Sequence, residues 1–275
     1  SSDVCSSDLN RHPAHARHRL HVFSCHRGGF GERPRAGRCR RAGEDLHHRR
    51  HRGRAGRGER GGRVIIQTFM PDDPAVRAKA AEVTGGTTDP VEKSRLLYQA
   101  VRDGIRYDPY VDYTDRETYR ASSVLRSGHA YCVGKAALYA ALCRASGIPA
   151  RLGLADVKNH LATPRLLEAV GTDLFAYHGY VEIKPGADWI KVTPTFNASL
   201  CQKLGVTPLE FSGTDDALMQ PFDDKGRAFM SYVTQHGTFF DVPAKFLIAE
   251  MARLYPKLCR PGGMRGDMEA EGGKR

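Results

Sequence analysis

The segment 132–145, with the sequence CVGKAALYAALCRA, is apolar on nearly every face when it is wound as a helix. A helix without a polar face is buried on all sides in a globular protein, so this segment is predicted to lie at the centre of the fold. Gly147 suits the end of such a helix, and Pro149 prevents its continuation. The remaining elements must therefore pack around one central helix.

The segments before the central helix have the features of further helices. Asp89 is a good helix cap, Pro90 suits the first helical position, and apolar residues recur at helical spacing over 96–101 until Gly104. A short helix is predicted at 122–126. The first half of the domain is thus expected to be helical.

The segments after the central helix show the alternation of apolar and polar residues that is typical of strands. This alternation covers 151–157, 177–183 and 189–193. The connection 158–174 is long and contains a short helical pattern near 164–170, so we expect a lid or a specificity insertion there. Helices followed by an antiparallel sheet define the α+β class.

The positive charge of this 275-residue chain is concentrated in its first quarter. Residues 1–63 contain sixteen Arg, no Lys and six acidic residues, which leaves only +1 of the formal net charge of +11 for residues 64–275. We interpret residues 1–63 as translated adapter sequence followed by GC-rich DNA read out of frame, because Arg, Gly, His and Ala dominate the segment. The alternative is a disordered basic arm that contacts nucleic-acid phosphates. No nucleic-acid partner is expected for residues 64–275.

We predict one domain over residues 64–257, with its core at about 96–197 and a last amphipathic helix at 244–254. The Gly-rich, charged segment 258–275 is predicted to be a disordered tail. No stretch approaches the ~18 apolar residues of a membrane-spanning helix, so no membrane partner is expected. The cysteines lack the spacing of a disulfide scaffold or a zinc site, which favours a reduced, cytoplasmic protein without a metal.

Two residues are candidates for chemistry. Cys132 stands at the predicted start of the central helix, where unpaired amides and the helix dipole favour a thiolate and could hold an oxyanion. Taken alone, such a cysteine is more often a small buried hydrophobe. His178 lies inside a predicted strand, next to Gly179, which leaves room beside the imidazole; it is the candidate base. The remaining cysteines of residues 64–275 are expected to be structural: Cys143, Cys201 and Cys259.

Four blocks together resemble the transglutaminase-like superfamily, whose fold is related to that of the papain-type cysteine peptidases. The blocks are GHAYCVGKA (128–136), LCRASGIPAR (142–151), HGYVE (178–182) and WIKVTPT (189–195). In that family a cysteine heads a helix, a histidine follows on a strand, and an aspartate on the next strand orients the histidine. The resemblance implies that Cys132 and His178 fill the first two roles, with the buried helix packed on an antiparallel sheet.

The third position departs from the family pattern, because Thr193 stands where the family has aspartate. A threonine hydroxyl can accept a hydrogen bond from the imidazole and orient it, but it cannot stabilise an imidazolium by charge. Asn197 is another candidate to orient His178, although a turn residue at the end of the strand is the commoner role. Asp156 and Asp241 could also approach from elsewhere in the chain.

Two aromatic residues are assigned to the surroundings of the site. Tyr131 precedes Cys132 and is expected in the pocket wall or beside the oxyanion position. Trp189, the single tryptophan, precedes a strand and is expected in the core or the pocket wall. His129 is expected to be a solvated loop residue.

The sequence favours a cysteine-dependent acyl-transfer enzyme of the bacterial transglutaminase-like type. Cys132 would attack a peptide or protein amide, His178 would carry the proton, and water or an amine would resolve the thioester, with hydrolysis as the favoured outcome. No cofactor is expected. The alternative is a transglutaminase-like module without catalytic activity that binds a peptide or scaffolds an assembly, because the aspartate is missing.

Overall fold

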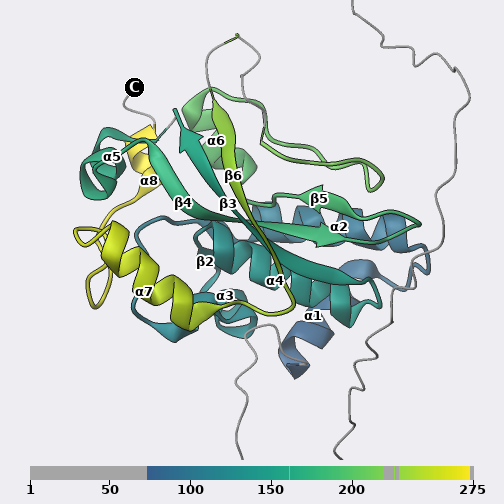
Figure 1. Cartoon of the computed structure of the whole chain (residues 1–275). Coiled ribbons are helices and arrows are strands. Elements are labelled where there is room, and N and C mark those ends of the chain that lie inside the picture. The colour runs from purple at the N-terminus through teal and green to yellow at the C-terminus, as the bar shows by residue number, and fades with distance from the viewer. Residues whose placement is uncertain (1–72, 161, 220–225, 227–228, 273–275) are drawn as a thin grey trace, which may run out of the picture. The chain divides into compact units, whose positions relative to one another are not determined.

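The computed structural model describes residues 73–160, 162–219, 226 and 229–272 (Figure 1). The interpretation of residues 1–63 concerns a segment outside the described residues.

Helices form the first part of the domain, as predicted. They are α1 (Pro74–Thr84), α2 (Pro90–Gly104), α3 (Ala121–Ser127) and α4 (Cys132–Ala145), with a 3-10 turn at Arg116–Tyr119. Asp89 caps α2 by accepting from the amides of Val91 (3.1 Å) and Glu92 (3.3 Å). The capping pattern in the sequence therefore placed the start of α2 correctly. The sequence prediction missed α1, although Asp73 caps it in the same way.

The strands follow, and four of them form an antiparallel sheet in the order β5-β4-β3-β6. Their bounds are β3 (Ala150–Asn159), β4 (Leu174–Ile183), β5 (Ile190–Val192) and β6 (Met230–Phe239). The α+β class is thus confirmed. The edge strand β6 was not predicted, because most of its residues are half-buried or exposed and it lacks a strong apolar face.

Short elements complete the chain. A parallel two-stranded pair joins β1 (Arg106–Tyr107) to β2 (His129–Ala130). The later helices are α5 (Pro164–Val170), α6 (Ala198–Leu204), α7 (Ala244–Leu254) and α8 (Met268–Gly272). Both α5 and α7 lie at the positions predicted from the sequence.

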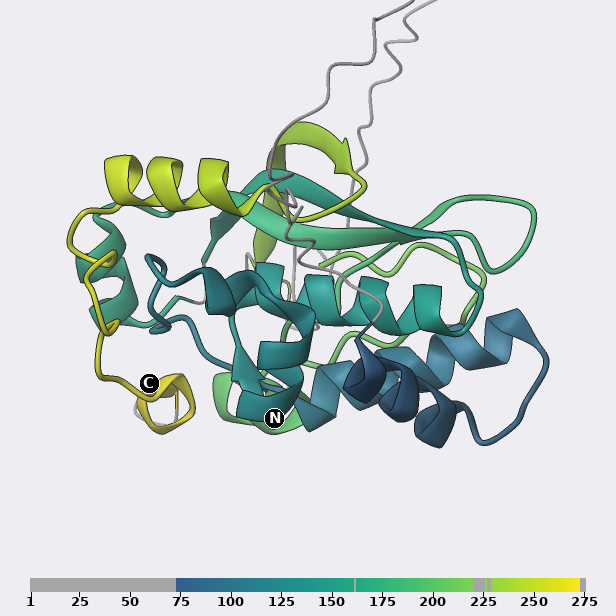
Figure 2. The same cartoon turned by 90° about the horizontal axis from the view of Figure 1, so that it is seen from below.

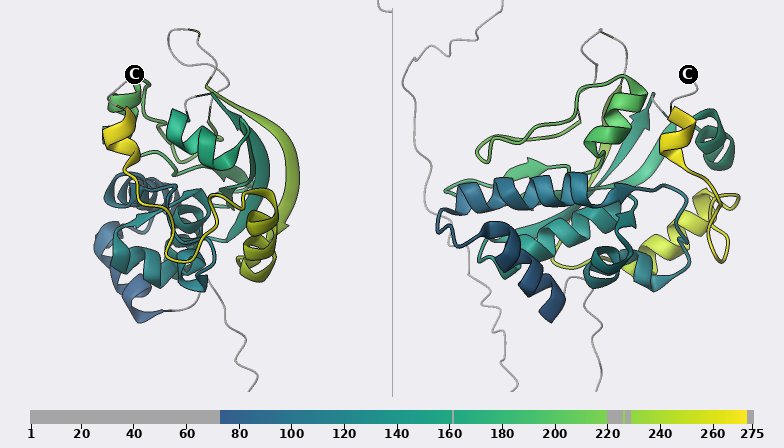
Figure 3. Two further views of the ribbon diagram at one scale, coloured as in Figure 1. Left: turned by 90° about the vertical axis from the view of Figure 1, so that its left-hand side faces the viewer. Right: turned by 180° about the vertical axis from the view of Figure 1, so that it is seen from behind.

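The central helix α4 lies between the sheet and the other N-terminal helices (Figures 2 and 3). It contacts β3 and β4 on one side and α1, α2 and α3 on the other. Residues 132–143 are all buried, which confirms the prediction of a helix buried on every face. No helix among residues 73–272 that the structure describes has the length and apolarity to cross a membrane.

One charged residue lies inside this apolar helix. Lys135 has no exposed surface, and its ammonium group donates to the carbonyls of Arg102 (2.8 Å) and Ile105 at the end of α2. A cation at a helix C-terminus compensates the unpaired carbonyls and the dipole there. Burial lowers the pKa of Lys135 to about 7. Lys135 therefore joins α4 to α2 by hydrogen bonds, as does Tyr139 Oη, which donates to Ser94 O (3.1 Å).

The predicted disordered tail at 258–275 is wrong for the residues that the structure describes. Residues 258–272 run along the domain and end in α8, with Leu258 and Met268 buried. Glu271 accepts hydrogen bonds from Tyr110 Oη (2.6 Å) and Thr163 Oγ1 (2.7 Å). The composition is that of a tail, but a few buried residues and these bonds attach the segment to the domain.

Candidate active site

Cys132 is the first residue of α4, and a short strand pair fixes the loop before it. Asp108 N donates to Ala130 O at 2.9 Å beside the β1–β2 pair. Tyr131 enters the helix in an extended conformation, and its side chain makes no capping hydrogen bond. The amides of the first turn are therefore available to a group at the head of the helix.

Gly179 lets β4 bring the neighbouring His178 to the head of α4. A Cβ atom on Gly179 would lie 2.7 Å from Val133 Cα and 3.0 Å from Val133 N. Cβ atoms in proteins essentially never approach another atom that closely, so only glycine permits this contact. The space that the sequence predicted beside the imidazole is occupied by the first turn of α4.

A bulge in β4 determines which side chains face α4. Ala155 pairs with His178 and Val157 pairs with Phe175. Between these two pairs β3 has one residue and β4 has two. Ala155 and Val157 face the same side of the sheet, because they are two residues apart in β3. Their partners His178 and Phe175 therefore also face that side. Without the bulge, strict alternation would place His178 and Phe175 on opposite faces of the sheet.

Asp156 supports this bulge from β3. Its Oδ1 atom accepts from Tyr177 N (3.1 Å) and lies 2.7 Å from His236 Nε2. Tyr177 has φ +58°, and it is the non-glycine residue in the described part of the chain with a left-handed backbone. Its ring packs on the imidazole of His236, with 4.8 Å between centroids. Asp156 thus holds a strained residue immediately before His178.

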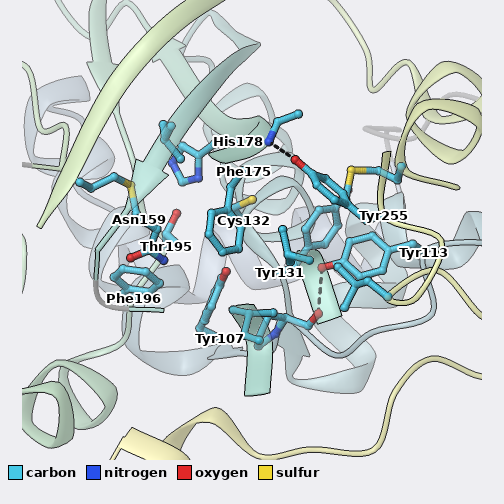
Figure 4. Close-up of a pocket in the computed structure, with 18 residues that line it drawn as sticks. Tyr107, Tyr113, Tyr131, Cys132, Asn159, Phe175, His178, Thr195, Phe196 and Tyr255 are labelled. Atoms are coloured by element: carbon cyan, nitrogen blue, oxygen red, sulfur yellow. Dashed lines mark hydrogen bonds between the residues drawn. The ribbon is translucent and has the colours of Figure 1, made fainter. Parts of the chain in front are cut away.

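Cys132 and His178 point into one pocket from α4 and β4 (Figure 4). The pocket is small: the space open to the centre of a water molecule is about 40 Å³. Cys132 is 9% exposed and His178 is 5% exposed. The two candidate catalytic residues therefore share one largely closed cavity.

The thiol faces several backbone amides but remains protonated. Burial raises the pKa of Cys132 to about 11, and hydrogen bonds from the amides of Gly179, Val133 and Cys132 itself only reduce this rise. The expected thiolate at this helix end is therefore not the resting state, because desolvation outweighs the helix terminus.

The imidazole is also uncharged. Burial lowers the pKa of His178 to about 4, and its Nε2 atom is buried without a hydrogen-bond partner among the described residues. The resting site thus pairs a neutral thiol with a neutral imidazole. A neutral imidazole retains a lone pair and can accept a proton.

A family model matches part of the chain. The model of the transglutaminase-like superfamily matches residues 77–194, which carry Cys132, His178 and the helix and strand that hold them. Residues 77–194 form a transglutaminase-like domain.

The chain is similar to a candidate protease from Parabacteroides distasonis, with 18% identity over 42% of this chain and 22% of that one and a TM-score of 0.30. It is also similar to a candidate cysteine protease from Cytophaga hutchinsonii, with 18% identity over 60% of this chain and 49% of that one and a TM-score of 0.33. The matches span less than half the length of either protein. No curated protein gives a significant match.

The third position of the transglutaminase-like domain does not bond to His178. The Thr193 hydroxyl is buried and lies 3.2 Å from Tyr232 Oη, whose ring contacts the imidazole edge to face at 5.9 Å. Thr195 lines the pocket with His178 instead, and its hydroxyl is buried without a partner among the described residues. Thr193 directly follows β5 and lies beside Tyr232, whereas Thr195 is the threonine that lines the pocket.

Two other residues that were predicted to belong to the site lie away from the pocket. Asn197 accepts from Tyr107 N (3.0 Å) and donates to Glu269 Oε1 (2.7 Å), so its amide does not orient His178. The placement of Trp189 in the core or pocket wall is wrong, because it is 40% exposed and stacks on Arg151 (4.2 Å). It lies at the exposed turn before β5.

The remaining candidates divide between the pocket and the surface. Tyr131 lines the pocket, with its ring edge-on to Tyr113 at 4.9 Å. Asp241 accepts from Val242 N (2.8 Å) and does not line the pocket. Within the described ranges, no group of three or more His, Cys, Asp or Glu residues has the arrangement of a metal site.

Sequence reasoning missed Thr195 as a site residue and the bond between Asp156 and His236. Thr195 is the second threonine of the Thr-Pro-Thr block. The block could have indicated it as a further candidate, because Pro194 separates the two threonines and their side chains face different surroundings. The bulge that brings Asp156 to Tyr177 leaves no comparable pattern in the sequence.

Proposed function

We propose that the chain is a cysteine-dependent acyl-transfer enzyme. Cys132 Sγ attacks the carbonyl carbon of an amide, and a bond forms between sulfur and carbon. The thiol proton passes to His178 and then to the departing amine as the carbon–nitrogen bond breaks. Water then attacks the thioester, which releases the acid and returns the proton to Cys132.

The observation that carries this proposal is the arrangement at the head of α4. The Cys132 thiol faces the amides of Gly179 and Val133 and shares a pocket with the neutral imidazole of His178. Backbone amides at this position can stabilise the oxyanion that develops during attack. Because burial disfavours both charged forms, proton transfer accompanies formation of the sulfur–carbon bond instead of preceding it.

The proposed substrate is a peptide or protein amide, and hydrolysis is the proposed outcome over cross-linking. The pocket is largely closed, which suits one acyl group and a small acceptor such as water. The proposed chemistry uses only groups of the chain itself and requires no cofactor.

The test is acylation of the full chain by p-nitrophenyl acetate, followed by nitrophenolate release and by mass spectrometry of the cysteine peptides. We expect an acetyl group on Cys132 in the wild type and none in Cys132→Ala. His178→Ala should slow the acylation by about 100-fold or more. His178→Gln, which keeps most of the volume, serves as a second variant, and an unfolding midpoint for each variant shows that it is folded.

Cys259 is the internal control for this experiment. Burial raises its pKa to about 11 as well, but it does not line the pocket of His178. Acylation of Cys259 should therefore be slow and independent of His178. Equal acylation of Cys132 and Cys259 in the wild type, or no effect of either His178 variant, would refute the proposed function.

The second candidate function is a non-catalytic module that binds a peptide. The observation that favours it is the third position, where the hydroxyl of Thr193 bonds to Tyr232 and leaves His178 Nε2 without a partner. Such a module would bind an amide in the same pocket without acylation of Cys132. The experiment above separates the two functions.

A further inference from the structure

The pocket beside Cys132 has walls without formal charge. Among the described residues that line it there is no Asp, Glu, Lys or Arg, and burial keeps His178 neutral above about pH 4. Six aromatic rings form much of the wall: Tyr107, Tyr113, Tyr131, Phe175, Phe196 and Tyr255. Aliphatic side chains and two methionines provide most of the rest.

The protein itself satisfies the hydroxyl groups of two wall tyrosines, so these two rings present carbon to the pocket. Tyr113 Oη donates to Pro109 O at 2.8 Å. Tyr255 Oη donates to Leu174 O at 2.9 Å and accepts from Ala176 N at 2.7 Å. Figure 4 shows the bond from Tyr113 to Pro109 and the bond from Ala176 to Tyr255. Rings held in this way form a rigid apolar surface.

The carboxylate next to the wall is also turned away from the pocket. Asp108 lies between the wall residues Tyr107 and Pro109 in the sequence, but its oxygens accept from Tyr110 N (2.9 Å) and lie 3.1 Å from His129 Nδ1. A charged group on a bound substrate would therefore lose its hydration without gaining a partner of opposite charge.

Three residues that line the pocket have a polar side-chain atom left for a ligand: Thr195, His178 and Tyr131, whose Oη atom has no partner among the described residues. Thr195 is 1% exposed, and both its hydroxyl oxygen and His178 Nε2 are buried without partners in the described part of the chain. Figure 4 shows Thr195 beside His178. Buried polar groups are rarely left unpaired, so these atoms suit one neutral polar group of a ligand.

We infer that the pocket binds an uncharged, apolar acyl group, aromatic or branched aliphatic, next to one neutral polar group that bonds to Thr195. This inference rests on the proposed function, because it assigns the pocket to the acyl donor of the reaction at Cys132. Anionic and cationic acyl groups are excluded by the uncharged walls. The donor is therefore the amide of an apolar acid, such as a peptide with an apolar residue at the bond that is cleaved.

The first test measures acylation of Cys132 in the full chain by two p-nitrophenyl esters. One carries the 3-phenylpropanoyl group and the other the 3-(4-carboxyphenyl)propanoyl group, which ends in a carboxylate that cannot reach the ester. Each rate is divided by the rate of the same ester with free cysteine. We expect a ratio of at least about 100 in favour of the phenylpropanoyl ester, since a buried unpaired charge is strongly unfavourable. A ratio near one would overturn the inference.

The second test is independent of catalysis. The Cys132→Ala chain is titrated calorimetrically with 3-phenylpropanamide and with succinamate. If 3-phenylpropanamide binds and succinamate does not, the inference is supported. This support would remain even if no ester acylated the wild type. Equal binding of both, or binding of succinamate only, would overturn it while leaving the proposed reaction intact.

A pair of variants tests the polar position. Thr195→Val keeps the shape and removes the hydroxyl, whereas Thr195→Ser keeps the hydroxyl. We expect Thr195→Val in the Cys132→Ala chain to weaken binding of 3-phenylpropanamide by about ten-fold and Thr195→Ser to weaken it much less. Unchanged binding in Thr195→Val would show that the hydroxyl does not hold the ligand.

Discussion

Replacement of Gly179 by alanine tests whether the close approach of β4 to α4 forms the site. The added Cβ would lie 2.7 Å from Val133 Cα, 3.0 Å from Val133 N and 3.1 Å from Val133 Cγ2. Two of these atoms belong to the backbone of the first turn of α4, so they cannot rotate away as a side-chain end would. The strand or the helix must therefore shift.

The size of the effect follows from this geometry. Insertion of a methyl group into a well-packed interior typically costs about 1–3 kcal/mol of the free energy of unfolding. We expect Gly179→Ala to lie towards the upper end, because backbone meets backbone on one side of the contact. The shift also separates His178 from Cys132, so acylation of Cys132 should fall by at least about ten-fold.

Gly104→Ala is the matched control. A Cβ atom on Gly104, at the end of α2, would meet nothing within 4 Å. Alanine is favoured over glycine in helices by about 1 kcal/mol, so this variant should be as stable as the wild type or slightly more stable. Urea unfolding of the two variants gives the free energies, and mass spectrometry of Cys132 after treatment with p-nitrophenyl acetate gives the rates. A Gly179→Ala protein within about 0.5 kcal/mol of the wild type, with the wild-type rate, would show that the reasoning is wrong.

Four further results are expected. Burial lowers the pKa of His178 to about 4 from the usual 6.5, so the free energy of unfolding should fall as the pH falls from 6.5 to 4. The loss should be about 3 kcal/mol relative to His178→Gln, measured by urea unfolding. Parallel pH curves for the two proteins would contradict this. Tyr255→Phe removes a hydroxyl that bonds to two backbone groups of β4, so it should cost about 1–3 kcal/mol in the same assay, and an unchanged midpoint would show that these bonds contribute nothing. Asp156→Ala removes the carboxylate that holds the bulge before His178, so acylation of Cys132 should become slower. The imidazole should also become more exposed, so the acidic limit of the pH–rate profile should move from about 4 towards 6.5. A wild-type profile would argue against a role of Asp156 in positioning His178. Thr193→Val should cost about 1 kcal/mol, whereas Thr195→Val should be nearly neutral in stability because only the Thr193 hydroxyl has a protein partner, and the reverse order would refute this assignment.

Local patterns predicted the elements that carry the site. Asp89 with Pro90 fixed the start of α2, and the apolar segment from Cys132 fixed both ends of α4. These predictions depended on capping and on helical spacing, which involve residues near one another in the chain. The relation of Cys132 to His178 came from the family resemblance, and the structure places both in one pocket.

The features that the sequence did not predict depend on contacts between distant segments. A thiol at a helix start was expected to be a thiolate, but the surrounding aromatic walls bury Cys132 and reverse the direction of the pKa shift. The polar composition of 258–275 gave no indication that Glu271 bonds to Tyr110. Trp189 was assigned by residue type alone, and an exposed turn with Arg151 nearby was enough to make that assignment wrong.

The pocket is completed by residues that the ribosome adds long after Cys132. Tyr255 and Leu258 cover the pocket, and Glu271 bonds to Tyr110, which is 161 positions earlier in the chain. The chain is synthesised from its N-terminus at about 5–20 residues per second. A nascent chain that has already made α4, β3 and β4 therefore still lacks this cover, and its thiol is open to water and to oxidants. The segment that covers Cys132 is thus made after the helix and the strands that surround it.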